Sequence, residues 1–173
     1  MKKQFIICLL LTSLFSQSFK DLSERPVYKP FKMSSSITFD GKVDLEEWGN
    51  AQVATNFIGS GSFQGEDALL KTEARLMYDD TNLYISFKAF VDRDELRYSI
   101  TKRDNLDDKD DRVWINIDAF DDESLTYGIG VSAGGAQIDG RATYGFDQSL
   151  DLVYDTKVQI FDNRYEVEMV IPF

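Results

Sequence analysis

The chain has 173 residues with one Cys, no His, and 30 acidic against 19 basic side chains, a net charge of −11 at pH 7. Without histidine, a Ser-His-Asp or Cys-His nucleophile and an imidazole zinc site are excluded. The acidic balance disfavours nucleic acid and anionic membranes as partners, because the field of the chain repels both. With 43% apolar and 13% aromatic residues, the composition is that of a globular protein of one domain.

Residues 1–18 have the pattern of a secretory signal peptide. Lys2 and Lys3 precede a largely apolar stretch at 5–15, and residues 16–18 supply small side chains at the cleavage-defining positions. The apolar stretch is too short for a membrane-spanning helix, which needs about 20 residues. We therefore expect an exported protein. Its mature chain lacks cysteine and depends on burial of a core rather than on disulfides.

The first part of the mature chain is expected to contain little regular structure. Residues 19–36 carry two prolines and a run of three serines without sustained periodicity, which predicts a leader or linker. Residues 37–39 predict a short strand that ends at the Asp40-Gly41 turn. Residues 43–48 predict a short helix with an acidic N-cap candidate and two Glu in its first turn. The Gly/Ser-rich segment 59–65 is predicted to be a loop.

From residue 73 onward apolar residues recur at every second position, which predicts strands with one buried face. Two pairs of strands are separated by Asp/Asn turns and form hairpins, and Asp139-Gly140 is a further candidate turn. The predicted strands are 73–78, 83–91, 113–119, 127–131, 137–138, 157–161 and 164–171. This pattern, with one short helix near the amino end, predicts an all-β fold, an antiparallel, jelly-roll-like β-sandwich. Because the strand pattern is still running at Phe173, we expect the domain to lack its final strand.

Several short motifs follow one another in an order typical of a known family. They are Ile37-Thr38-Phe39-Asp40-Gly41-Lys42-Val43-Asp44, Glu46-Glu47-Trp48, Tyr78-Asp79-Asp80, Leu83-Tyr84-Ile85, Arg103-Asp104, Asp110-Asp111, Ile117-Asp118, Tyr127-Gly128 and Val167-Glu168-Met169-Val170-Ile171-Pro172-Phe173. In this order they resemble carbohydrate-binding module family 9, in the version found at the amino end of bacterial proteins with a predicted outer-membrane β-barrel. The resemblance spans residues 37–173.

The resemblance implies a non-catalytic, sugar-binding β-sandwich over residues 37–173, truncated at its carboxy end. It further implies a periplasmic or outer-membrane location and association with polysaccharide degradation or uptake. The partner would be an oligo- or polysaccharide, and an outer-membrane barrel or a hydrolase domain could follow in the full-length protein. No residue pair stands out among the 30 acids for glycoside hydrolysis, so we expect no enzyme activity in this chain.

Trp114 is the residue best suited to contact a sugar. Strand alternation places Trp114, Asn116 and Asp118 on the face opposite to the apolar residues between them. An indole beside an amide and a carboxylate suits a pyranose, because the ring stacks on the indole while its hydroxyls form hydrogen bonds. Arg103 and Tyr144 are expected as rim contacts from neighbouring loops. The alternative is that Trp114 packs in a second layer of the sandwich.

Two glycines on the next strand support the Trp114 hypothesis, and the second tryptophan of the chain is the other aromatic candidate. Gly128 and Gly130 alternate with apolar residues on the next strand and would leave open space on one face. Trp48 is interpreted as a structural plug at the end of the sandwich rather than as a second sugar contact.

The densest acidic run, residues 104–111, is a candidate calcium site, because calcium accepts several carboxylate oxygens in flexible geometry. The run is not an EF-hand, since it lacks the glycine at the sixth loop position. A solvated, self-repelling loop is the alternative, as is a pairing of Asp111 with Arg103. The candidate ligands are Asp104, Asp107, Asp108, Asp110 and Asp111.

The sequence as a whole predicts an exported module that binds carbohydrate without catalysis. The alternative belongs to another class of function, a structural periplasmic domain that docks onto or gates an outer-membrane barrel and has no affinity for sugars.

Overall fold

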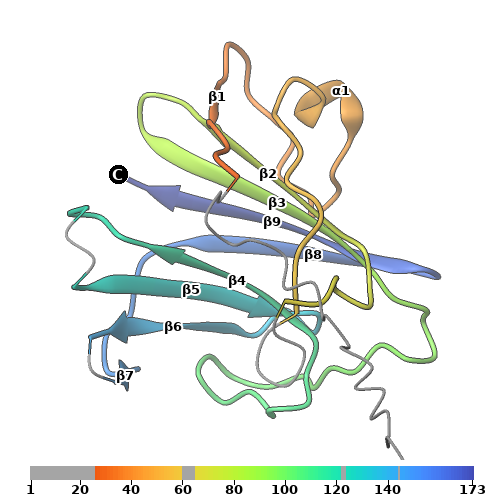
Figure 1. Ribbon diagram of the computed structural model, residues 1–173. Helices are drawn as coiled ribbons and strands as arrows, with labels where there is room; N and C mark the ends of the chain where they lie inside the picture. Colours follow the sequence, from red (N-terminus) through yellow and green to blue (C-terminus); the bar gives the residue numbers. More distant parts are fainter. Residues whose placement is uncertain (1–25, 60–64, 122–123, 144) are drawn as a thin grey trace, which may run out of the picture.

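The computed structural model describes residues 26–59, 65–121, 124–143 and 145–173, which form two stacked sheets (Figure 1). One sheet has the strand order β1-β2-β3-β9-β8 and the other β4-β5-β6-β7. The elements are β1 (Phe31–Lys32), α1 (Leu45–Trp48), β2 (Thr72–Tyr78), β3 (Asn82–Phe90), β4 (Arg112–Ile117), β5 (Thr126–Ser132), β6 (Gln137–Ala142), β7 (Phe146–Asp147), β8 (Asp155–Phe161) and β9 (Arg164–Pro172). The predicted all-β sandwich is confirmed, with antiparallel pairing throughout the described strands except between β1 and β2.

The main core lies between the two sheets and consists of the residues that alternate inward along each strand. β3 and β9 contribute Phe87 and Val167, which are register partners, and β5 contributes Val131 from the other sheet. Val167 and Val131 are completely buried. Burial of each such side chain stabilises the fold by about 1.5–3 kcal/mol, and this is why a period of two specifies the sandwich.

The amino-proximal segment differs from the prediction. Residues 37–39 do not form a strand; instead the half-buried Ile37 packs against a second apolar cluster beside α1, a contact that requires no pairing in a sheet. The predicted leader contains β1, which pairs in parallel with the end of β2. The predicted signal peptide and most of the Gly/Ser-rich loop, residues 60–64, lie outside the described residues.

The Asp139-Gly140 dipeptide is not a turn, contrary to the prediction. Both residues lie inside β6, which is therefore longer than the two residues expected. Asp139 is completely buried there and forms an ion pair with Arg103. A buried, paired carboxylate is compatible with a strand interior, and the turn preference of Asp-Gly is overridden by this contact.

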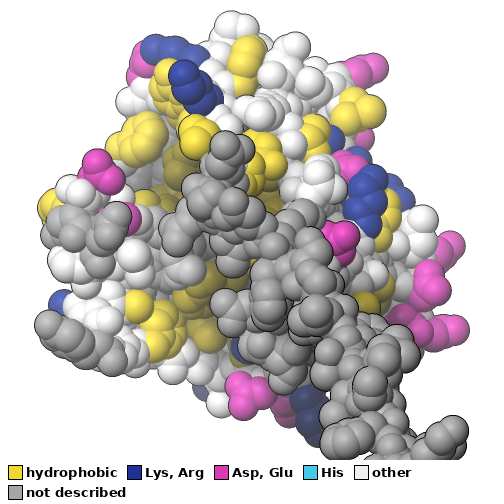
Figure 2. Space-filling model, viewed as in Figure 1, with side chains coloured by type: hydrophobic (Ala, Val, Ile, Leu, Met, Phe, Trp, Pro, Cys, Tyr) yellow, Lys and Arg dark blue, Asp and Glu magenta, His cyan; other side chains and the backbone are white. Residues whose placement is uncertain are grey.

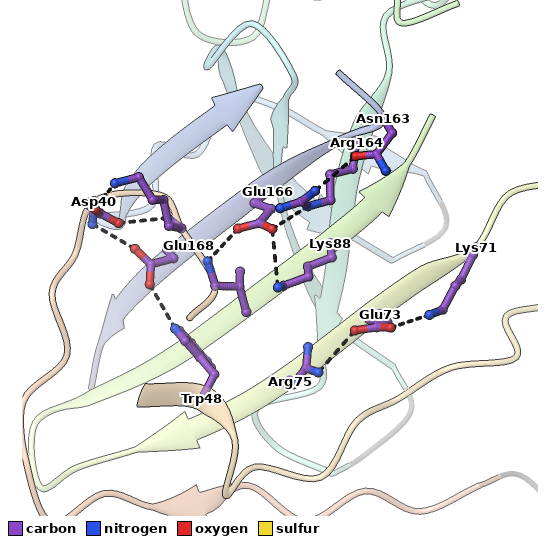
Figure 3. Close-up of polar contacts among 12 residues, drawn as sticks. Asp40, Trp48, Lys71, Glu73, Arg75, Lys88, Asn163, Arg164, Glu166 and Glu168 are labelled. Atoms are coloured by element: carbon purple, nitrogen blue, oxygen red, sulfur yellow. Dashed lines mark hydrogen bonds and ion pairs between the residues drawn. The ribbon is translucent and has the colours of Figure 1, made fainter. Parts of the chain in front are cut away.

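Two buried carboxylates of β9 hold the amino-proximal segment on the outer face of the five-stranded sheet (Figure 3). Glu168 accepts hydrogen bonds from the Gly41 N–H at 2.7 Å and from the Trp48 Nε1–H at 3.0 Å. Glu166 accepts one from the Val43 N–H at 2.7 Å. Burial raises the pKa of Glu168 above its usual value, while these donors oppose the shift. Trp48 is completely buried and structural, as predicted, but it packs against Met77 on the outer face of this sheet and does not plug the end of the sandwich.

Candidate functional site

Trp114 lies on the outer face of the four-stranded sheet, on the opposite side from the core. Its register partner on β5 is Gly130, and Gly128 stands two residues along. A Cβ at Gly128 would lie 2.0 Å from an indole atom, and one at Gly130 would lie 2.4 Å from another. The half-buried indole therefore lies flat on the glycine backbone of β5. The space that the sequence predicted over these glycines is filled by the Trp114 ring.

Phe146 on β7 extends this aromatic surface. Its ring centroid lies 5.5 Å from that of Trp114 at an interplanar angle of 63°, an edge-to-face contact. The ring covers Gly140, where a Cβ would lie 2.8 Å from it, and the side chain is 47% exposed. We call Trp114 and Phe146 the aromatic platform. The sequence prediction missed Phe146, because a two-residue strand shows no alternation.

The polar groups nearest the platform belong to the same strand as Trp114. The indole Nε1–H donates a hydrogen bond of 2.8 Å to Asn116 Oδ1, so these two predicted site residues are in direct contact. Asp118 follows the end of β4, and its carboxylate accepts the Phe120 N–H at 3.1 Å. Asn116 is exposed and Asp118 is half-buried.

The other two predicted rim contacts are not added to the platform. The Arg103 guanidinium pairs with the buried Asp139 carboxylate and donates to the Leu152 carbonyl at 2.7 Å. Asp139 stands opposite Ile129 on the inward face of the sheet, so Arg103 serves the interior rather than the outer face. Its pairing with Asp139 also replaces the pairing with Asp111 considered above. Tyr144 lies outside the described residues.

The carboxylates of the predicted calcium run do not converge on one point. The carboxylates of Asp104 and Asp111 each accept a hydrogen bond from a backbone N–H group of another segment. The Asp107 carboxylate accepts a hydrogen bond from a backbone N–H group of its own loop, and the Asp110 carboxylate accepts one from the Ser99 hydroxyl. Asp108 is exposed. In the part of the chain that the structure describes, no three acidic side chains are grouped so that they could hold a metal ion. These residues instead fasten the 97–111 loop.

A groove lies between the two sheets and is lined by residues of both. Hydrophobic side chains gather in the middle of the face seen in Figure 2, along the seam between the sheets, while most acidic ones stand at its periphery. The groove has a volume of about 290 Å³ and is lined by Ile117, Tyr127, Ile129, Leu152, Val153, Ile171 and Pro172. Because this lining is mostly apolar, it offers few hydrogen bonds to a sugar. The aromatic platform is therefore the better candidate for the sugar-binding site.

Comparison with known proteins agrees with this architecture. Similar solved structures are a carbohydrate-binding module family 9 from Caldicellulosiruptor kristjanssonii in complex with glucose (TM-score 0.59, 19% identity, 85% of this chain and 68% of that chain) and in complex with cellotriose (0.57, 20%, 84% and 68%). A third is a protein from Bacteroides uniformis (TM-score 0.57, 10% identity, 83% and 71%). At these identities the likeness shows the fold. No curated protein matches the chain.

The remaining findings concern membrane-spanning helices and the family of the chain. No helix within the described residues is long and apolar enough to cross a membrane. The sequence pattern of the family described as "Carbohydrate family 9 binding domain-like" matches residues 39–173, most of the chain and the whole of both sheets apart from β1. The chain therefore belongs to the carbohydrate family 9 binding domain-like family.

Proposed function

We propose that the chain binds carbohydrate without catalysis, and that the saccharide lies on the aromatic platform. The observation that carries the proposal is the position of the Trp114 indole, which rests flat on Gly128 and Gly130 with its other face turned away from the sheet. The axial C–H groups of a pyranose stack on such a surface, and Phe146 enlarges it beside the indole. Family membership supports binding rather than catalysis.

The site is preorganised but small. The hydrogen bond to Asn116 and the edge contact with Phe146 both restrict the indole, so little side-chain entropy is lost when a sugar stacks on it. A polar ligand releases little apolar surface and competes with water for each hydrogen bond. We therefore expect weak binding at each site, of the kind that becomes useful when a polymer offers many equivalent sugars.

Affinity electrophoresis against a panel of plant and microbial glycans tests the proposal. Wild type should be retarded by at least one glycan, and Trp114→Ala should lose that retardation because the stacking surface is gone. Phe146→Ala should weaken it. Phe31→Ala removes an exposed ring from the other sheet and serves as the matched control, with no expected effect. If wild type and Trp114→Ala migrate identically with every glycan, the platform is not a sugar site.

The cellular setting is a separate part of the proposal. The amino-terminal segment supports export to the periplasm or outer membrane, where the module would serve polysaccharide degradation or uptake. The reading frame downstream of Phe173 discriminates the settings. A hydrolase domain there would support targeting of an enzyme to its substrate, and many alternating segments of ~10 residues would support attachment to an outer-membrane barrel. Recovery of the protein in the cytoplasmic fraction of its native cells would contradict export.

A further inference from the structure

We infer that the aromatic platform recognises a carboxylated sugar, a uronic acid residue of an acidic polysaccharide. The inference rests on the proposed function and names the class of saccharide for the same site. It follows from two hydrogen-bonding groups that flank Trp114 on β4, Asn116 and Arg112, each of which presents N–H donors to a ligand.

Asn116 is the first of these groups. An indole N–H can only donate, so the amide must turn its oxygen toward Trp114, as the 2.8 Å bond shows. This fixes the orientation of the amide and leaves the two N–H donors of Nδ2 for a ligand. The indole donor is itself satisfied by the same bond. A saccharide on the platform therefore meets Asn116 as a donor to its own oxygen atoms.

Arg112 is the second group, on the other side of Trp114. It lies two residues earlier on the same strand and therefore on the same face, with its Cα about 7 Å from that of Trp114. The side chain is exposed, and its guanidinium has no ion pair or hydrogen bond within the described residues. A guanidinium carries five N–H donors in a planar fork that fits a carboxylate in a bidentate arrangement. It is within reach of a ring stacked on the indole.

The order of charges along β4 gives the ligand a direction. Arg112 stands at one end of the outward row, and Asp118 follows the other end, with Trp114 and Asn116 between them. An anionic group would be attracted toward Arg112 and repelled by Asp118. A uronic acid meets this pattern when its carboxylate points to Arg112 and its hydroxyl oxygens point to Asn116. A neutral hexose leaves the guanidinium without a charged partner.

The net charge of −11 opposes a polyanion at long range, but it does not decide binding at contact. At physiological ionic strength charges more than about 8 Å apart are largely screened. The pair between Arg112 and a carboxylate is formed at hydrogen-bond distance and is screened much less. Retention of an acidic polymer by this acidic chain would therefore report a specific contact rather than general attraction.

The test compares two forms of one backbone, polygalacturonate and its highly methyl-esterified form, in affinity electrophoresis. Wild type should bind the acid form roughly tenfold more tightly, the size expected for a charged hydrogen-bonded pair. Arg112→Gln should abolish this preference and keep the residual binding of the ester. Arg93→Gln makes the same change of charge on an exposed arginine after β3 and should keep the preference. Thermal unfolding of each variant confirms that it is folded.

Each other outcome overturns a defined part of the account. Equal binding of both forms, or a preference that survives Arg112→Gln, overturns the uronic acid inference and leaves the platform intact. Binding of a neutral glycan alone, if it is lost in Trp114→Ala, also overturns the uronic acid inference and leaves the platform intact. If no glycan is bound, or if binding is unaffected by Trp114→Ala, the proposed function itself fails.

Discussion

At the scale of single residues, three glycines determine the surface of the outer face. Gly128, Gly130 and Gly140 lie on adjacent strands, and each has an aromatic ring where a Cβ would be. Glycine in a strand interior weakens the strand, so its use at three neighbouring positions needs a reason. The close approach of Trp114 and Phe146 to the backbone is that reason.

This arrangement predicts that Gly128→Ala reduces sugar binding without unfolding the protein. The new methyl group would displace the indole ring, so we expect roughly a tenfold loss of affinity and a change in unfolding free energy of about 1 kcal/mol or less. Affinity electrophoresis and thermal unfolding measure the two quantities. Gly145→Ala is the matched control, since nothing lies within 4 Å of the added Cβ. Unchanged binding in Gly128→Ala would show that the indole position is unimportant.

At the scale of elements, the sequence predicts those strands that are long enough to alternate and that end at recognisable turns. β2 with β3 and β8 with β9 were both predicted as hairpins, and the structure confirms both. The prediction failed where tertiary contacts override local preference. The half-buried Ile37 packs against an apolar cluster without joining a sheet, and the Asp139 carboxylate forms an ion pair with Arg103 inside β6.

The turn between β2 and β3 makes a prediction about pH. Asp79 accepts the Thr81 and Asn82 N–H groups at 2.7 and 2.8 Å and the Tyr84 hydroxyl at 2.8 Å. These bonds lower its pKa well below the usual 3.8, the Thr81 N–H contributing most. A carboxyl group whose pKa is lowered by folding contributes its full stabilisation at pH values above its usual pKa. This contribution is lost as the pH falls below that usual pKa.

Thermal unfolding between pH 5 and pH 2 measures this contribution. Wild type should lose more stability on acidification than Asp79→Asn, whose amide does not titrate. Asp94→Asn changes an exposed aspartate that makes no hydrogen bond within the described residues, and it should retain the wild-type slope. Parallel curves for wild type and Asp79→Asn would contradict the role of the turn.

At the scale of the whole molecule, the two outer faces of the sandwich have different roles. On the five-stranded sheet, Glu166 and Glu168 hold the segment around α1, which covers that face with the buried Trp48 (Figure 3). The four-stranded sheet carries the platform instead. Sequence alternation could place Trp114 outside the core, and this was confirmed. The contact with Phe146 could not be predicted, because it depends on the register of four strands.

The central claim is that sugar binds at Trp114 and not elsewhere on the sandwich, and the two tryptophans of the chain allow a direct test. Each gives one indole N–H signal in a ¹H–¹⁵N correlation spectrum of the folded protein. During titration with oligosaccharides, neutral and uronic, the Trp114 signal should shift in a saturable way while that of the buried Trp48 stays fixed. Saturable binding that leaves the Trp114 signal unmoved would contradict the account.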